Sequence, residues 1–290
     1  MAGRASGCND HLNNIIEKLK ASPLFHLSLA SKELFHSNFL AWLCECYPQE
    51  GGSLFAGYPP TPLAAITELR VYRERRNVDL TLEYANGQTL IVENKVKSLP
   101  KRAQFEEYAA DFPDRSSTGL LLLTLTQPTF QDRNSPTVTL KDGAVWHIML
   151  YHDLAERLRT IQPIIHAGNG YHGELVADYI DFVSCLDELQ ALFEINWDDD
   201  TADFLNPDYD LERLRDIRLH DLIAKLRYAR LASQVAEVLA QRGLRAVDGP
   251  LHDGCPGHVL TDFGLTNGTG LFDFKYVVLD KALLGNPVLL

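Results

Sequence analysis

The 290-residue sequence lacks any apolar run long enough to cross a membrane. Its longest apolar runs, such as residues 119–125, are far shorter than the ~20 residues that a membrane-spanning helix needs. The first ten residues, MAGRASGCND, contain no apolar signal core. We therefore expect a cytoplasmic protein with no membrane partner. Hydrophobic residues make up 46% of the chain and charged residues 23%, which is enough for one large core or two small ones.

Paired cysteines and an excess of positive charge are also lacking. The five cysteines, at positions 8, 44, 46, 185 and 255, include no C-x-x-C pair. This spacing argues against a disulfide framework and against a zinc ribbon. The net charge of -12 repels nucleic acid at long range. Binding to a polyanion would therefore need a locally basic surface or a partner protein.

The spacing of the apolar residues predicts a chain of mixed α/β (α+β) class. Helical spacing occurs over residues 11–20 and 31–47, and a Gly- and Pro-rich loop follows at 51–62. Three strands, a helix and a fourth strand are then expected at 67–74, 77–84, 88–96, 101–112 and 118–125. The predicted order from residue 31 is therefore α, β, β, β, α, β. The almost continuous apolar run at 118–125 is typical of a strand that is covered on both faces.

The remainder of the chain reads as mostly helical. We expect a short strand at 144–150, followed by helices and a closing hairpin, at 151–161, 173–195, 210–243, 258–263 and 270–279. The acidic, turn-rich segment 196–210 is the best candidate for a linker, and Asn267-Gly268 is expected to form the last turn. Our predicted division is a core with N-terminal helices over residues 1–160, and a helical region ending in a short hairpin over 161–290.

The hairpin formed by the second and third strands has two possible registers. Its turn contains Asn86-Gly87. A two-residue loop would mix apolar and polar side chains on both faces. A three-residue loop, with Gly87 in the left-handed conformation, instead pairs Tyr84 with Gln88 and sorts the apolar residues onto one face. Because a one-residue slip would turn the apolar set toward the polar environment, we predict the second register.

This register has a chemical consequence, because it sets Asp79 across from Glu93 and puts Lys95 further along the same face. Like charges that face each other on a sheet are destabilising, and a cation between them would remove the conflict. Mg²⁺ is commonly held by one or two carboxylates together with waters and a phosphate oxygen. The pattern therefore favours a Mg²⁺ site, with Mn²⁺ as a substitute. Lys95 could then assist the attacking water or stabilise charge on a phosphate.

These residues resemble the PD-(D/E)XK nuclease superfamily. Asp79, followed by Glu93-Asn94-Lys95, is similar to its D…(D/E)xK signature, although Asn77-Val78 stand where the motif has its proline. The resemblance covers about residues 31–126 and implies a restriction-endonuclease-like αβββαβ core with a mostly helical C-terminal extension. Further matches are Gln104 and Tyr108, one helical turn apart, and the stretch ELFHSNFLAWL, which is similar to a bacterial branch of uncharacterised and defence-associated members.

The resemblance implies a metal-dependent nuclease that acts on DNA in preference to RNA, with a role in defence against foreign DNA. It implies Glu33, Asp79 and Glu93 as metal ligands and Asp79, Glu93, Lys95 and Gln104 as catalytic residues. The charge around the motif fits DNA as the partner, because residues 68–102 contain eight basic side chains and five acidic ones. The expected nucleic-acid contacts are Arg73, Arg75, Arg76, Lys97, Lys101, Arg102 and Tyr108. A homo-oligomer or a partner protein remains open.

Less specific explanations compete with each assignment. Glu33 lies near the start of a helix, where the helix dipole favours an acid, and Gln104 with Tyr108 could be an ordinary surface pair. The alternative function is a nuclease-like fold that binds nucleic acid or protein with weak turnover or none, or a scaffold whose helical half is the working surface. Two other motifs, Asp273-Phe274-Lys275 and residues 252–258, carry acids, His and Cys, but we interpret both as structural.

Overall fold

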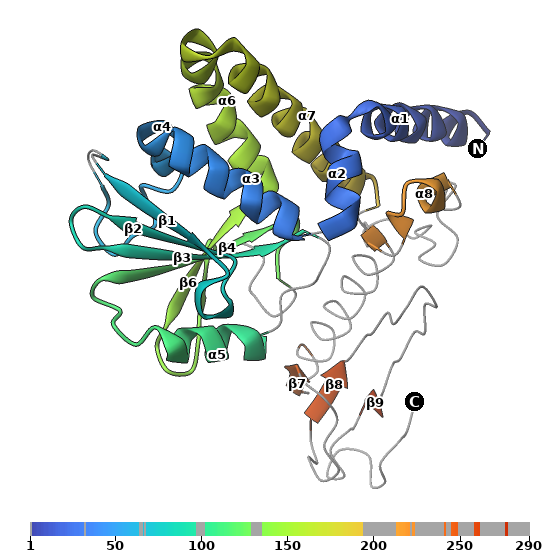
Figure 1. Ribbon diagram of the computed structural model, residues 1–290. Helices are drawn as coiled ribbons and strands as arrows, with labels where there is room; N and C mark the ends of the chain where they lie inside the picture. The colour runs from blue at the N-terminus through green and yellow to red at the C-terminus, as the bar shows by residue number, and fades with distance from the viewer. Residues whose placement is uncertain are drawn as a thin grey trace, which may run out of the picture. The chain divides into compact units, whose positions relative to one another are not determined.

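The computed structural model describes residues 2–31, 33–63, 66, 68–96, 102–128, 135–193, 213–220, 222–223, 241, 245–248, 258–261 and 276–277 (Figure 1). The chain divides into two compact units. One comprises 1–127 and 133–191, and the other comprises 128–132 and 192–290. The residues of the candidate site all belong to the first unit.

The first unit contains seven α-helices and six strands among its described residues. The helices are α1 (Ala2–Ala21), α2 (Pro23–Ser31), α3 (Glu33–Cys46), α4 (Pro48–Ser53), α5 (Arg102–Asp111), α6 (Tyr151–Gly168) and α7 (Gly170–Leu192). The strands are β1 (Leu69–Arg73), β2 (Leu80–Tyr84), β3 (Thr89–Lys95), β4 (Thr118–Thr124), β5 (Thr137–Thr139) and β6 (Val145–Leu150), and a 3-10 turn η1 (Arg75–Asn77) joins β1 to β2.

The six strands form one open, mixed sheet in the order β1-β2-β3-β4-β6-β5. Strand β2 runs antiparallel to both β1 and β3, whereas β3, β4 and β6 are parallel and β5 is antiparallel to β6. From α3 onward the main elements follow the predicted order of helix, three strands, helix and strand, with α4 inserted after α3. The C-terminal ends of β1, β3, β4 and β6 therefore lie at the same end of the sheet as the start of β2.

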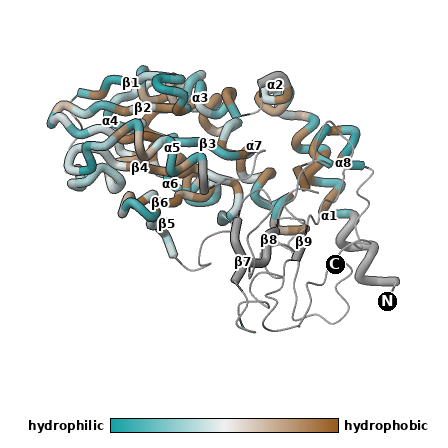
Figure 2. Tube along the Cα trace, turned by 90° about the horizontal axis from the view of Figure 1, so that it is seen from below, coloured by the Kyte–Doolittle hydropathy of each residue, from teal (hydrophilic) through white to brown (hydrophobic). Residues whose placement is uncertain are grey.

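Helices cover both faces of this sheet. Figure 1 shows α3, α4, α6 and α7 on one side and α5 on the other. Apolar residues concentrate in the sheet between these layers, most clearly along β4 in Figure 2. Every residue of β4 after Thr118 is buried, which confirms the prediction that this strand is covered on both faces. On the α5 side, the ring of Phe105 stacks on Trp146 of β6 with centroids 4.8 Å apart.

The predicted three-residue hairpin loop is confirmed. Leu82 lies opposite Leu90 and Leu80 opposite Val92. At the turn, the amide of Tyr84 donates to the carbonyl of Gln88 over 2.9 Å, and Gly87 has a φ of 82°. The chain therefore adopts the register that keeps the apolar set on one face, where Leu80, Leu82, Leu90 and Val92 are buried.

Several elements of the first unit differ from the prediction. Helix α2 and strand β5 were not predicted, and α4 occupies the beginning of the segment 51–62 that was read as loop. Helix α6 continues through Pro163 to Gly168, although the prediction ended it at residue 161. Proline removes one helical N–H, but Ile161 and Ile165 on either side are buried and hold the helix against its neighbours.

The second unit is described only in short segments. These are α8 (Arg213–Asp216), β7 (Arg245–Asp248), β8 (His258–Thr261) and β9 (Tyr276–Val277). The predicted antiparallel pairing of the last two strands is confirmed between β8 and β9, and β7 joins β8 in parallel. The linker candidate 196–210, the turn at Asn267-Gly268 and the motif 273–275 lie outside the described residues. No helix in the described part of the chain is long and apolar enough to cross a membrane.

Candidate active site

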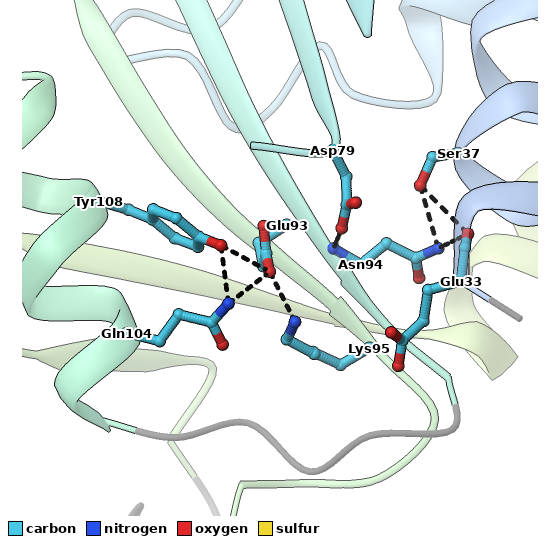
Figure 3. Close-up of polar contacts among 8 residues, drawn as sticks. All are labelled: Glu33, Ser37, Asp79, Glu93, Asn94, Lys95, Gln104 and Tyr108. Atoms are coloured by element: carbon cyan, nitrogen blue, oxygen red, sulfur yellow. Dashed lines mark hydrogen bonds and ion pairs between the residues drawn. The ribbon is translucent and has the colours of Figure 1, made fainter. Parts of the chain in front are cut away.

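Polar side chains gather where β2 begins and β3 ends (Figure 3). Asp79 directly precedes β2, and Glu93 and Lys95 lie at the C-terminal end of β3. The confirmed register ends with Leu80 opposite Val92, and its continuation by one residue sets position 79 opposite position 93. In open α/β sheets, ligands bind beyond the carboxyl ends of the parallel strands. The hairpin register alone therefore brings two acids and a lysine to the end of the sheet where binding sites form.

Glu93 is the centre of this cluster and is only 2% exposed. Its Oε1 lies 2.7 Å from Nζ of Lys95 and accepts hydrogen bonds from Nε2 of Gln104 over 3.2 Å and from the hydroxyl of Tyr108 over 3.4 Å. Its other oxygen, Oε2, is buried and has no hydrogen-bond partner among the described residues. A buried carboxylate oxygen without a partner is energetically costly unless something else binds it.

Helix α5 supplies the groups that contact Glu93 on the face of the sheet that this helix covers. Gln104 and Tyr108 are one helical turn apart, and Nε2 of Gln104 also donates to the Tyr108 hydroxyl over 2.7 Å. Burial raises the pKa of Tyr108, and the charge of Glu93 raises it further. Both residues proposed from the sequence thus converge on one carboxylate oxygen. Tyr108, which was expected to contact nucleic acid, is 8% exposed.

Asp79 is partly buried beside Glu93. Its Oδ2 accepts a hydrogen bond from the backbone N–H of Asn94 over 2.8 Å. Burial raises the pKa of Asp79, whereas this N–H and the charge of Lys95 oppose the rise. The charge of Glu33 raises the Asp79 pKa as well, which places the Glu33 carboxylate within electrostatic range of the pair.

Burial and neighbouring charges also shift the pKa values of Glu93 and Lys95. Burial first and Asp79 second raise the pKa of Glu93 to about 7, although Lys95 opposes this shift. Burial on its own would lower the pKa of Lys95, but the charges of Glu93, Glu33 and Asp79 outweigh it and raise the pKa above its usual value. Lys95 therefore stays protonated while Glu93 titrates near neutral pH.

Glu33 joins the cluster from the opposite face of the sheet. It begins α3 and is partly exposed. Figure 3 shows its carboxylate beside the Lys95 side chain, in agreement with its electrostatic effect on that lysine. Lys95 thus contacts one carboxylate, that of Glu93, and lies within electrostatic range of two more, those of Glu33 and Asp79. In the described part of the chain, however, no three Asp, Glu, His or Cys side chains stand together as a ready-made set of metal ligands.

Comparison of the chain with protein-family models, with curated proteins and with solved structures found no match. The interpretation of the cluster therefore depends on the chemistry of its own side chains.

The expected nucleic-acid contacts are described only in part. Arg73 donates to Oδ1 of Asn38 over 3.0 Å, and Arg76 donates to the carbonyl of Asp111 over 2.9 Å. Arg75 instead forms an ion pair of 2.5 Å with Glu83. These three arginines are exposed on and beside η1. Lys97 and Lys101 lie outside the described residues, and Arg102 begins α5 with a side chain that is not described.

Asn94 is the polar residue of the site that sequence reasoning underestimated. The structure gives it both a backbone partner, the carbonyl of Glu33, and side-chain partners, Ser37 and Tyr151. The available signal was its position, because Asn94 is the one polar residue on the apolar face of β3.

Proposed function

We propose that this chain is a Mg²⁺-dependent nuclease with a restriction-endonuclease-like core, and that it hydrolyses phosphodiester bonds of DNA. The observation that carries the proposal is Glu93, a buried carboxylate with one oxygen on Lys95 and the other without a partner. Asp79 lies within electrostatic range of Glu93, and Glu33 lies within electrostatic range of Asp79 and Lys95. The order α, β, β, β, α, β supports the resemblance to the PD-(D/E)XK nuclease superfamily. A role in defence against foreign DNA is part of the proposal and rests on the resemblance.

The donor set fits a hard divalent cation. Glu33, Asp79 and Glu93 would hold Mg²⁺, because hard cations bind carboxylate oxygens, and the partnerless Oε2 of Glu93 is an available ligand atom. Mn²⁺ is expected to substitute. The bound ion would act as a Lewis acid that stabilises negative charge on the phosphate. It would compete with Lys95 for Glu93, since the lysine already contacts Oε1 over 2.7 Å.

Each protein group then has a defined role. A lysine with a raised pKa remains an ammonium group at neutral pH, which favours charge stabilisation at the phosphate over removal of a proton from water. In the metal-free protein the pKa of Glu93 is about 7, and its carboxyl group must be ionised to bind the cation. Gln104 and Tyr108 hold the Glu93 carboxylate in one orientation through Oε1. Substrate would approach from the side of Glu33 and Asp79, which are only partly buried.

The test of this function is a cleavage assay on plasmid and linear DNA. We expect cleavage that needs Mg²⁺ or Mn²⁺, stops in EDTA and returns when the ion is restored. Asp79→Asn keeps an oxygen that can accept from the amide of Asn94 but removes the charge. Because a metal ligand contributes several kcal/mol, this variant should lose at least ~10²-fold in rate. Cleavage that survives both EDTA and Asp79→Asn would contradict the proposal.

The arginines on and beside η1 should contribute unequally to DNA binding. Arg73 and Arg76 bond to uncharged oxygens and keep their full charge, whereas Glu83 neutralises Arg75. We expect Arg73→Ala and Arg76→Ala each to weaken binding about 2- to 10-fold and to reduce the slope of log affinity against log salt by ~1. Arg75→Ala should change both quantities less.

Fluorescence anisotropy of a labelled duplex between 50 and 200 mM salt measures this ranking. Lys95→Met should be present in every protein, so that the duplex stays intact when Mg²⁺ is added. An Arg75→Ala effect as large as that of Arg73→Ala would show that the Glu83 ion pair does not control the contribution of Arg75. Equal binding by all three variants and their parent would mean that these arginines do not contribute to DNA binding.

The second candidate is a nuclease-like binding module without turnover. One observation favours it, because the three acids do not form a ready-made ligand set in the described part of the chain. The net charge of -12 is also unusual for a DNA enzyme. A binding module would bind the duplex in the anisotropy experiment without cleaving it in any divalent ion. That combination of results would replace the first proposal with this one.

A further inference from the structure

We propose that Asn94 is a positioning residue that holds the first turn of α3, and with it Glu33, against the end of β3 that carries Glu93 and Lys95. The inference rests on the proposed function, because it identifies what sets the geometry of the acid cluster. It gives a role to the middle residue of Glu93-Asn94-Lys95, which lies on the opposite face of the sheet from its two neighbours.

Asn94 contacts three separate elements. Its backbone N–H donates to Oδ2 of Asp79 over 2.8 Å, at the start of β2. Its Nδ2 donates to the carbonyl of Glu33 over 3.1 Å and to Oγ of Ser37 over 3.3 Å, both in α3. Its Oδ1 accepts from the Tyr151 hydroxyl of α6 over 2.6 Å. One residue that is 1% exposed therefore connects the two acids that come from outside β3.

These partners allow only one orientation of the side-chain amide. The carbonyl of Glu33 can only accept a hydrogen bond, so Nδ2 must face α3. Oδ1 then faces α6 and must accept from Tyr151. Turning the amide over would set two carbonyl oxygens against each other, so the contacts fix α3 and α6 at defined positions around β3.

A second set of contacts ties the same helix to the same point. Tyr151 also hydrogen-bonds the Tyr179 hydroxyl of α7, and that hydroxyl lies 2.9 Å from Nδ1 of His36 in α3. Since Tyr151 donates to Asn94, it must accept from Tyr179. The hydrogen bonds that run from Asn94 through Tyr151 and Tyr179 thus lead back to α3 at His36. The next residue, Ser37, contacts Asn94 directly.

The environment of this network indicates that it serves more than packing. Asn94, Tyr151, Tyr179 and His36 are each no more than 1% exposed, and the neighbours of Asn94 on its face of β3, Val92 and Val96, are apolar. Buried polar groups are costly unless all their partners are in place. A valine at position 94 would avoid that cost. The network instead secures a helix start, where displacement of a catalytic group by about 1 Å can cost ~10²-fold in rate.

Tyr151→Phe tests the inference because it removes the hydroxyl and keeps the ring. Tyr84→Phe is the matched control, since its buried hydroxyl has no hydrogen-bond partner among the described residues. Two quantities are measured on the full chain: hydrogen exchange of the amides over residues 33–40, with β4 as reference, and Mn²⁺ affinity by electron paramagnetic resonance. Tyr151 supports Asn94, which contacts both Asp79 and Glu33, and loss of support around metal ligands commonly weakens affinity ~10- to 100-fold.

We expect Tyr151→Phe to bind Mn²⁺ at least ~10-fold more weakly and to speed exchange over 33–40 with β4 unchanged. Tyr84→Phe should match the wild type in both. Unchanged exchange over 33–40, or an equal acceleration in β4, would overturn the positioning role. A wild-type protein that binds no Mn²⁺ would count against the proposed function, and the exchange result would still decide the role of Asn94.

Discussion

Lys95→Met should reduce DNA cleavage by ~10²- to 10⁴-fold while divalent-ion affinity is kept or increased. The loss of rate follows from removal of the ammonium group that contacts Glu93, where preorganised charge stabilisation typically contributes a factor of this size. The gain in affinity follows because Nζ of Lys95 lies 2.7 Å from Oε1 of Glu93 and competes for that carboxylate. Methionine preserves an unbranched chain of similar length in a position that is 9% exposed.

This experiment should be carried out at pH 8.5. The charge of Lys95 lowers the Glu93 pKa, so its removal leaves that pKa higher than about 7. At a lower pH, protonation of Glu93 would weaken metal binding and hide the expected gain. Lys141→Met, at an exposed turn, is the matched control and should change neither quantity. Cleavage within a few-fold of wild type would remove Lys95 from the reaction, and loss of metal binding together with cleavage would make it a structural residue.

The part of the site formed by the hairpin could be predicted from the sequence because it depends on local rules. Alternation of apolar residues and a glycine at the αL position fix the register, and continuation of that register by one residue sets Asp79 opposite Glu93. The sequence also indicates that two facing acids need a cation. The structure adds that Lys95 already provides one, through contact with Glu93.

The contacts of Asn94 could not be predicted because they depend on packing between distant parts of the chain. Glu33 and Ser37 are 61 and 57 positions away from it, and Tyr151 is also 57 positions away. No periodicity links such positions. A polar residue on an apolar face signals that a partner must exist, but the partner becomes known only when α3 and α6 are placed on the sheet.

The missed elements have a related explanation. Helix α2 is mostly apolar, and its few polar residues do not form the separate polar face that reveals a surface helix. Strand β5 has only three residues, too few for a period of two to be recognised. In α6, the expected break at Pro163 is offset by burial of Ile161 and Ile165, which the local sequence does not disclose.

Glu93→Gln should abolish cleavage and at the same time stabilise the metal-free protein at alkaline pH. The ordinary pKa of Glu93 is 4.5, and in the folded protein it is about 7. Between these values the folded state holds a proton that the unfolded state has lost, so stability falls as pH rises through this window. The full cost of ionising the buried Glu93, about 3 kcal/mol as an upper estimate, lowers the free energy of unfolding above pH 7. Glutamine is neutral at every pH, so Glu93→Gln removes this cost.

The decisive measurement is the free energy of unfolding in urea and EDTA at pH 5 and at pH 8. At pH 5 the wild-type side chain is protonated, so Glu93→Gln should be neutral or slightly destabilising. At pH 8 the effect of the substitution on the free energy of unfolding should be more stabilising than at pH 5 by about 2 to 3 kcal/mol. The exposed Glu107→Gln on α5 should differ by less than ~0.5 kcal/mol between the two conditions. An equal effect of Glu93→Gln at both pH values would mean that Glu93 is ionised in the folded protein at pH 5, which would leave no buried conflict for a metal ion to relieve.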